Sequence, residues 1–254
     1  MRFETIALEV SPRSIATVLL NRPERRNAFN RLMLSELAAV LDEIAADRAV
    51  RVMVLRSQGR HFCAGADLAE RERGEADRPV GPTLLDVLAS LDNLPKPTIA
   101  AVNGGAIGGG AAFVACCDIA LATDAAFFAI PEVRVGMAPV RLAPLFIRAV
   151  GYRGFRRYGL TGERMTAVDA LRLGLVHQLC TAQSLDSAVV EVADALLHGA
   201  PGAMAELKAA TSRLAAPPWP AADARIGHGL PKTPEAIEGI ASFRDKRKPS
   251  WYPK

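Results

Sequence analysis

Two glycine-bearing segments, each directly after an apolar run, are the places where this sequence could do chemistry. The first, residues 59–68, reads Gly-Arg-His-Phe-Cys-Ala-Gly-Ala-Asp-Leu, and the second, residues 103–110, reads Asn-Gly-Gly-Ala-Ile-Gly-Gly-Gly. Small residues at a strand-to-helix junction let backbone N–H groups face a ligand, and the start of a helix adds partial positive charge there. One N–H from each segment, aimed at the same oxygen, would form an oxyanion hole.

The second segment does not have the pattern of a dinucleotide-binding loop. Its glycines follow the spacing Gly105-x-x-Gly108-x-Gly110, and no acidic residue stands where a ribose-binding carboxylate would belong. The four histidines are scattered, and the four cysteines, which include the adjacent Cys116 and Cys117, lack metal-ligand spacing. We therefore expect no metal site and expect the cysteines to be buried free thiols.

Alternating strands and helices must position the two segments. Apolar runs predict strands at residues 6–10, 15–20, 50–55, 98–102 and 119–122. Helical spacing of apolar residues after the N-cap residue Asn30 predicts a helix over 31–47, and the second segment is expected to open a helix that runs through Cys116. Further helices are predicted at residues 142–150, 153–160, 167–172, 185–197, 203–214 and 234–244. This order is typical of an α/β fold with crossover helices.

Composition excludes several classes of protein. The chain has 254 residues, of which 50% are hydrophobic and 23% charged, a balance that suits one large globular domain and excludes intrinsic disorder. An apolar run long enough for a membrane span is missing, and the first residues lack a signal-peptide core, so we expect a cytoplasmic protein. The net charge of +4 suits an anionic small molecule, and the basic stripe with interleaved aromatic residues that is typical of nucleic-acid binding is missing.

Further short motifs are distributed along nearly the whole chain. They are Leu-Asn-Arg-Pro (20–23) with Asn-Ala (27–28), Phe-Cys-Ala-Gly-Ala-Asp-Leu (62–68), Lys-Pro-Thr-Ile-Ala-Ala-Val-Asn-Gly (96–104) with three glycines (108–110), Cys-Asp-Ile-Ala (117–120), Pro-Glu (131–132), Leu-Thr-Gly-Glu (160–163), Gly-Leu-Val (174–176), and Glu-Gly-Ile-Ala-Ser-Phe (238–243) with Lys-Arg-Lys-Pro (246–249). In this order and spacing they resemble the enoyl-CoA hydratase/isomerase (crotonase) superfamily.

The resemblance implies a fold, a substrate and an assembly. The fold would be α/β, a crotonase spiral of ββα units over residues 1–190 with a helical trimerisation region over residues 191–254. The substrate would be an acyl-CoA thioester. No further cofactor is implied, because coenzyme A is part of the substrate. Neither nucleic acid nor a membrane is expected as a partner, and the assembly would be a homotrimer or a dimer of trimers.

The resemblance also implies roles for individual residues. The N–H groups of Ala66 and Gly109 would hold the thioester oxygen as the substrate becomes an enolate, and Glu132 would be the catalytic acid/base. Residues implied in substrate binding are Arg25, Ala64, Asp67, Leu68, Gly108, Phe243 and Lys246. Of these, Arg25 would lie near the CoA phosphates, and Phe243 and Lys246 would contact the nucleotide end, often from a neighbouring subunit.

The sequence departs from the family pattern in two places. Hydratases of the family's type member carry a second glutamate where this chain has Ala112, whose methyl group can neither hold water nor move a proton. Residues 136–144 also differ, and there the chain is similar to the methylglutaconyl-CoA and isohexenylglutaconyl-CoA hydratases. That similarity implies Arg134 or Arg141 as a partner for a second substrate carboxylate, although for each residue a plain surface arginine is the favoured interpretation.

Three functions remain open from the sequence. A hydratase would add water across the 2,3-double bond of an enoyl-CoA, with Glu132 handling the proton. An isomerase would move the double bond with a single carboxylate, which the alanine at position 112 favours. A CoA-binding protein with little turnover is the third reading, and the intact pair of oxyanion segments argues against it.

Overall fold

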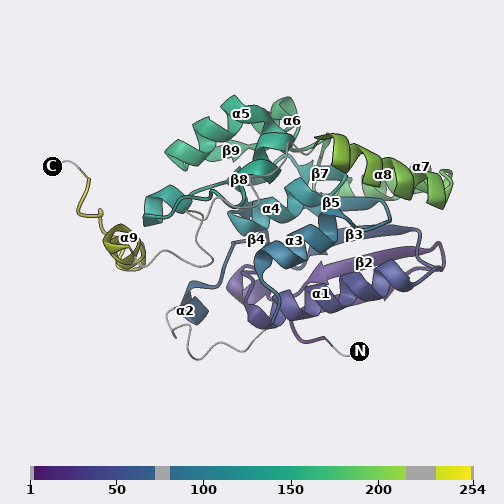
Figure 1. The fold of residues 1–254 in the computed structure, drawn as a ribbon, viewed down its shortest axis with the longest axis horizontal. Coiled ribbons are helices and arrows are strands. Elements are labelled where there is room, and N and C mark those ends of the chain that lie inside the picture. The colour runs from purple at the N-terminus through teal and green to yellow at the C-terminus, as the bar shows by residue number, and fades with distance from the viewer. Residues whose placement is uncertain (1–2, 72–80, 216–232, 253–254) are drawn as a thin grey trace.

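Two β-sheets form the centre of the molecule, and helices cover them (Figure 1). The computed structural model describes residues 3–71, 81–215 and 233–252. The predicted α/β class is confirmed.

The larger sheet has six strands in the order β1-β2-β3-β5-β7-β10. Their bounds are β1 (Ile6–Val10), β2 (Ile15–Leu20), β3 (Val52–Ser57), β5 (Thr98–Val102), β7 (Ile119–Thr123) and β10 (Gln178–Cys180). Strands β1 and β2 pair antiparallel, and every later pair in this sheet is parallel. Parallel neighbours need long crossovers, and the helices between the strands supply them.

Helices bury both faces of this sheet, which explains why its strands appear in the sequence as continuous apolar runs. The helices α1 (Arg31–Ala46), α3 (Leu84–Asp92) and α4 (Gly109–Cys116) pack on one face, and α7 (Leu185–Leu197) packs on the other. Within β3 the side chains alternate between these layers. Met53 and Leu55 join the cluster with α1, whereas Val52 and Val54 join the cluster with α7.

The smaller sheet has four strands in the order β4-β6-β8-β9. Their bounds are β4 (His61–Cys63), β6 (Gly105–Ile107), β8 (Phe127–Ala129) and β9 (Arg164–Thr166). Strands β4, β6 and β8 run parallel, and β9 runs antiparallel to β8. The carboxyl ends of β4, β6 and β8 therefore meet at one edge of the sheet.

Helical elements complete the described chain. They are η1 (Pro23–Arg25), α2 (Leu68–Arg71), η2 (Glu132–Val135), α5 (Ala143–Thr161), α6 (Ala167–Leu173), α8 (Pro201–Ala215) and α9 (Pro234–Arg244). The backbone of α5 breaks at Gly151, where φ is +72°, so α5 is two successive helices, as the sequence predicts. In Figure 1, α9 lies at the left, away from the larger sheet.

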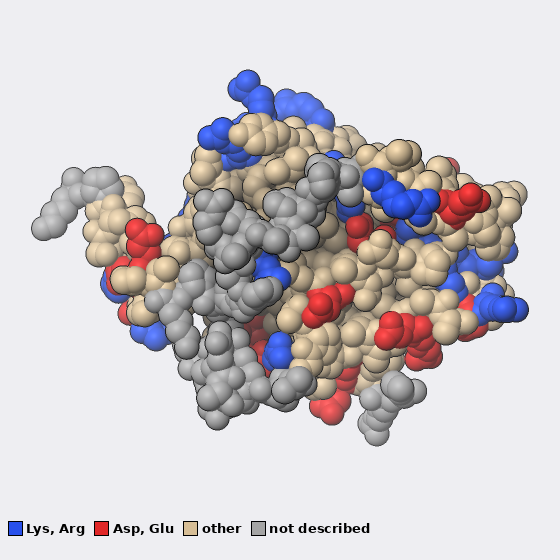
Figure 2. Space-filling model, viewed as in Figure 1, with Lys and Arg blue, Asp and Glu red and all other residues tan. Residues whose placement is uncertain are grey.

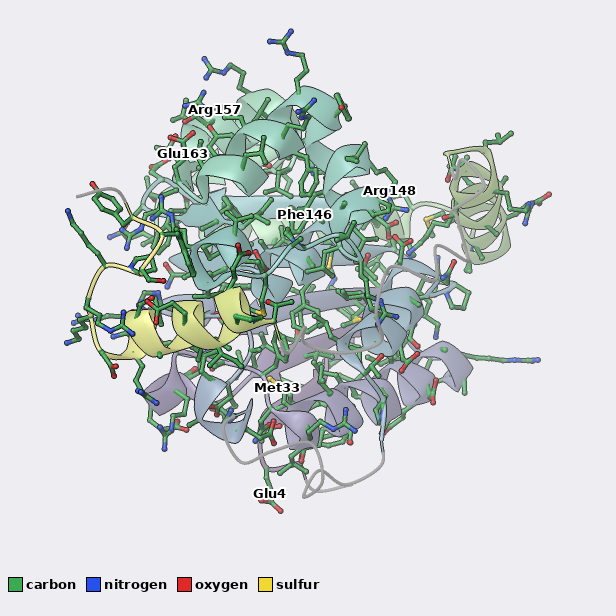
Figure 3. The ribbon with its side chains drawn as sticks, turned by 60° about the vertical axis from the view of Figure 1, so that its left-hand side comes forward. Glu4, Met33, Phe146, Arg148, Arg157 and Glu163 are labelled. Atoms are coloured by element: carbon green, nitrogen blue, oxygen red, sulfur yellow. The ribbon has the colours of Figure 1, made fainter. Side chains whose placement is uncertain are left out.

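Basic side chains gather over α5 at the top of Figure 2. The sequence of this helix contains Arg148, Arg153, Arg156 and Arg157. Two of them form ion pairs that tie neighbouring elements together. Arg148 pairs with Asp92 of α3, and Arg157 Nε lies 2.8 Å from Glu163 Oε1 at the end of the helix (Figure 3).

The structure confirms several predictions from the sequence and moves the start of one predicted strand. The helix over 31–47 is confirmed, and the Asn30 side chain caps it by accepting from the Met33 N–H. The strand predicted over 50–55 begins two residues later, because the turn at residues 47–50 takes up Val50. All four cysteines are buried and free, as expected. The expected division of the chain near residue 190 stays a prediction, and that residue lies within α7.

Two features are missing from the residues that the structure describes. No helix there is both long and apolar enough to cross a membrane. No group of three or more His, Cys, Asp or Glu side chains in those ranges is arranged to hold a metal ion.

Candidate active site

One candidate group follows each parallel strand of the smaller sheet. Ala66 comes three residues after β4, Gly109 comes two residues after β6, and Glu132 comes three residues after β8. Because these three strands end at the same edge, the chain brings together there the three catalytic candidates that the sequence predicts. Each is separated from its strand by too few residues to move far from that edge.

The two glycine-bearing segments touch through their backbones. A methyl group added at Gly110 would lie 2.4 Å from the carbonyl oxygen of Cys63, and one added at Gly65 would lie 3.0 Å from the carbonyl oxygen of Ile107. Both approaches are tighter than side chains ordinarily tolerate, and Gly65 also has φ at +88°. Glycine at these positions is what allows the segments to lie close enough to act on one atom.

The N–H groups of Ala66 and Gly109 are available as donors. Gly108, at φ +56°, is the N-cap of α4 and donates its own N–H to Ala129 O at 2.8 Å. Gly109 is then the first residue of α4, where a helix leaves its N–H groups unsatisfied. Within residues 3–71 and 81–215, neither the Ala66 nor the Gly109 N–H donates to a protein acceptor. The positive end of the α4 dipole adds to their attraction for an oxyanion.

A partly buried ion pair fixes the position of the Ala66 N–H. Phe29 donates its N–H to Gly65 O at 2.8 Å and accepts from the Asp67 N–H at 2.9 Å, so Ala66 lies in a short parallel bridge. The Asp67 carboxylate lies 3.0 Å from Arg22 Nη2, and the two side chains are only 13% and 14% exposed. Asp67 was predicted to bind substrate. That role stays a prediction; in the structure the Asp67 carboxylate pairs with Arg22 and supports the loop.

The side chain of Asn27 stabilises the start of the same loop by hydrogen bonds, a role that the sequence analysis did not assign. Its side chain is fully buried. It accepts from the Arg22 N–H and donates to the carbonyl oxygens of Gln58 and His61, each at 2.8 Å. The signal in the sequence was an asparagine within the Asn-Ala motif at residues 27–28. An asparagine buried in a turn must find hydrogen-bond partners for its side-chain amide, and here those partners belong to the loop.

Glu132 lies against the start of α4. A methyl group added at Gly108 would be 2.7 Å from Glu132 Oε1, so the carboxylate packs directly over the backbone of Gly108. The next N–H along the chain is that of Gly109. The carboxylate is thus one residue away from a predicted oxyanion donor, although 24 positions separate Glu132 from Gly108 in the sequence.

Ala112 lies one turn further along α4. Its N–H donates to Gly108 O at 3.1 Å, and its side chain is fully buried. A methyl group at this position carries no proton and accepts no hydrogen bond. Of the two acids expected in the hydratase pattern, the chain therefore provides only Glu132.

The other predicted substrate contacts lie around this centre. Ala64 precedes the loop glycine and donates its N–H to Arg26 O at 3.0 Å, and Leu68 begins α2. Arg25 ends η1 with an exposed side chain. Phe243, on α9, is 62% exposed, and Lys246 follows that helix with φ at +53°. The binding roles of these residues stay predictions.

The two arginines proposed for a second substrate carboxylate have different surroundings. Arg134 donates from Nε to Thr161 O at 3.1 Å and packs over Gly162, so it closes the end of α5. Arg141 is partly exposed and lies near α3. Hydrogen bonds within the Thr83 cap lower the pKa of Asp86, and the charge of Arg141 lowers it further.

Comparisons with known proteins identify the family and the fold of this chain. Residues 11–254 match the family described as Enoyl-CoA hydratase/isomerase. A carnitinyl-CoA dehydratase from Escherichia coli is 34% identical over 94% of this chain and 95% of the relative. A 2,3-dehydroadipyl-CoA hydratase from the same organism is 31% identical over 93% of this chain and 94% of the relative. The crystal structure of an enoyl-CoA hydratase from Mycobacterium avium subsp. paratuberculosis superposes with a TM-score of 0.85 at 27% identity, covering 99% of this chain and 100% of that one.

The family match spans nearly the whole chain, and the similar structure shows that the α/β architecture described above is the crotonase fold. The two glycine-bearing segments, the smaller sheet and the Pro-Glu turn all lie within the matched residues. This chain therefore belongs to the enoyl-CoA hydratase/isomerase family of enzymes.

Proposed function

We propose that this enzyme is an enoyl-CoA hydratase, which adds water across the C2–C3 double bond of an acyl-CoA thioester through an enolate. The observation that carries the proposal is the contact of Glu132 Oε1 with Gly108, beside the N–H of Gly109. A thioester oxygen bound by the Ala66 and Gly109 N–H groups would place the adjacent C2 and C3 atoms next to a carboxylate.

The reaction can be written with these groups alone. The Glu132 carboxylate takes a proton from water as the hydroxide oxygen bonds to C3. The C2–C3 π electrons move toward the thioester carbonyl, and the resulting enolate oxygen is stabilised by the two N–H groups. Glu132, now a carboxylic acid, returns its proton to C2 as the carbonyl re-forms. The sum is the addition of one water, with no resident cofactor required.

The named relatives support addition or removal of water, because one is a hydratase and another a dehydratase. The buried methyl group of Ala112 favours a second candidate, an enoyl-CoA double-bond isomerase. In that reaction Glu132 would remove a proton at one end of the allylic system and return it at the other, so no second acid is needed to hold water. The two candidates share the oxyanion hole and differ only in the fate of the proton.

The test is Glu132→Gln, assayed for loss of the conjugated enoyl thioester absorbance on straight, branched and dicarboxylic enoyl-CoA substrates. The amide keeps the shape but cannot carry the proton at neutral pH. General acid–base groups contribute roughly 100- to 10,000-fold, and we expect a loss at the upper end because no second glutamate substitutes. Glu43→Gln, on the exposed side of α1, is the matched control and should not change the rate.

Two outcomes would contradict the proposal. A fall of less than about tenfold in Glu132→Gln, below the acid–base range, would remove Glu132 from the chemistry. Wild-type enzyme that shifts the double bond of 3-enoyl-CoA substrates but hydrates none of the 2-enoyl substrates would establish the isomerase instead.

The proposal extends to the assembly. A homotrimer or a dimer of trimers would cover apolar side chains that are exposed in the single chain. These are Leu160 on α5, Val168 on α6, and Leu207 and Leu214 on α8, each more than 60% exposed.

A further inference from the structure

The C-terminal helix α9 packs directly on the turn that carries Glu132. Two glycines make the contact, one on each side. A methyl group added at Gly136, just after η2, would lie 2.3 Å from Glu235 O in the first turn of α9. One added at Gly239 of α9 would lie 2.4 Å from the carbonyl carbon of Val135. The backbones of α9 and η2 therefore touch at two points, one helical turn apart along α9.

The face of α9 at this contact consists of small residues. Ala236 and Ser242, one turn to either side of Gly239, are buried at 1% and 2% exposure. Ser242 Oγ donates within the helix to Gly239 O at 2.9 Å, so its hydroxyl needs no partner outside α9. By contrast, Ile237 on another side of the helix is 64% exposed. Figure 3 shows α9 lying across the front of the molecule, with the α5 region above it and the α1 region below.

The contacted turn is folded around the backbone of Glu132. Gly136 adopts φ +71°, a conformation that side chains disfavour, and its N–H bonds to Glu132 O and Val133 O. Met137 also donates its N–H to Glu132 O, at 3.0 Å. A shift of Val135 or Gly136 must therefore move the backbone of Glu132. The carboxylate of Glu132 lies in turn against Gly108.

We propose that α9 sets the position of the Glu132 carboxylate through the Gly136–Gly239 contact, and that Gly239 is a positioning residue for the reaction. This inference rests on the proposed function, in which Glu132 transfers the proton. It assigns α9 a task separate from the CoA contacts implied for Phe243 and Lys246. Those contacts would act on affinity for the nucleotide, whereas the glycine contact would act on the catalytic step.

The size of the expected effect follows from the distances. Ordinary contacts of a methyl group begin near 3.4 Å, so an alanine at 239 must push α9 and η2 apart by about 1.0 Å. A misplacement of about 1 Å in a reacting group can cost on the order of 100-fold in rate. Helix propensity alone favours alanine over glycine, so a loss of activity could not come from weakening α9 itself.

The experiment compares Gly239→Ala with Gly202→Ala by steady-state kinetics on the best enoyl-CoA substrate. Gly202 lies in α8 with nothing within 4 Å of an added methyl group, so it is a matched helix glycine without a contact. We expect Gly239→Ala to lower kcat by about 10- to 100-fold with KM changed less than threefold. We expect Gly202→Ala to resemble wild type. Binding of a saturated acyl-CoA, measured by calorimetry, checks that each variant is folded.

A second variant covers the case in which Gly239→Ala does not fold. Ala236→Gly removes a buried methyl group from the same contact without any clash, and Ala209→Gly, exposed on α8, is its control. We expect a smaller fall in kcat, of about threefold to tenfold, in Ala236→Gly alone.

The outcomes separate this inference from the proposed function. Wild-type kcat in a folded Gly239→Ala, or a change confined to KM, overturns the inference while an inactive Glu132→Gln still upholds the function. An active Glu132→Gln overturns both. A fall in kcat at unchanged acyl-CoA affinity, absent from the α8 controls, supports the positioning role.

Discussion

The ion pair between Arg22 and Asp67 offers a way to disturb one oxyanion donor without touching it. Both side chains are less than 15% exposed and lie 3.0 Å apart, and Arg22 Nη1 also donates to Ala28 O at 2.6 Å. Removing one partner of a buried pair costs about 3–5 kcal/mol. Because part of this pair remains in contact with water, we expect a lower cost, about 2–3 kcal/mol, for Arg22→Leu.

The measurable consequences are a lower melting temperature and a lower kcat. At this chain length, 1 kcal/mol shifts Tm by roughly 2–4 °C, so Arg22→Leu should melt about 4–12 °C below wild type. Complete loss of one oxyanion donor costs about 100- to 1000-fold in kcat. Here the Ala66 N–H is displaced rather than removed, and the Gly109 N–H on α4 stays in place, so we expect about a tenfold loss.

A double-mutant cycle is the assay, with Arg22→Leu, Asp67→Leu and the double variant measured by thermal denaturation and by kcat. Residues in direct contact should show a coupling free energy of about 0.5–3 kcal/mol. The exposed pair of Arg172 and Asp169 on α6 is the matched control, and Arg172→Leu should leave both measurements near wild type. Additive effects at positions 22 and 67, or normal kcat in the destabilised single variants, would refute the claim that the pair positions Ala66.

Two further predictions follow from the same structure. Ala112→Glu should raise the rate of hydration of a straight-chain 2-enoyl-CoA by at least about tenfold, since an acid–base group contributes roughly 100-fold or more. Ala112→Gln is of the same size but has no titrating group, and it should leave that rate unchanged. Equal effects of the two substitutions would contradict the prediction. Hydrogen bonds from Arg247, and from the Ser250 N–H, lower the pKa of Glu238 to about 2 from its ordinary 4.5. Because the pKa of Glu238 is lower in the folded protein, its carboxylate contributes fully to holding the segment after α9 above about pH 4.5. That contribution is lost as the pH falls toward 2. The emission of Trp251 in a Trp219→Phe background should report this loss, and Glu238→Gln should show the undocked emission already at neutral pH.

The larger sheet could be predicted because each of its central strands is long enough to show a pattern. Residues 99–102 and 119–122 are apolar without interruption, and both lie in strands that helices cover on two faces. The smaller sheet could not be predicted in the same way. Its strands have three residues each, too few for a period of two to appear. The glycines at 104 and 110 allow backbones to approach closely beside these strands.

The site was predictable where it depends on backbone. Loops rich in glycine after apolar strands indicated one donor in each loop, and the family resemblance implied Ala66 and Gly109 as those donors. The structure leaves both N–H groups available. Partners distant in sequence were not predictable. Nothing in the local pattern shows that Asp67 faces Arg22, 45 residues earlier, or that Gly239 touches Val135. Such pairings arise from the fold, and only coordinates reveal them.

The smaller sheet separates two chemical tasks physically. In the proposed function, the N–H groups that would polarise a carbonyl follow its first two strands, and the carboxylate that would move a proton follows its third. The N–H groups and the carboxylate therefore follow different strands. Rebuilding residues 131–137 would therefore change the group that moves protons beside the bound thioester, while leaving in place the two N–H groups that would stabilise its enolate. For enzyme engineering, the segments after β4 and β6 are the part of this sheet to keep, and residues 131–137 after β8 are the part to vary.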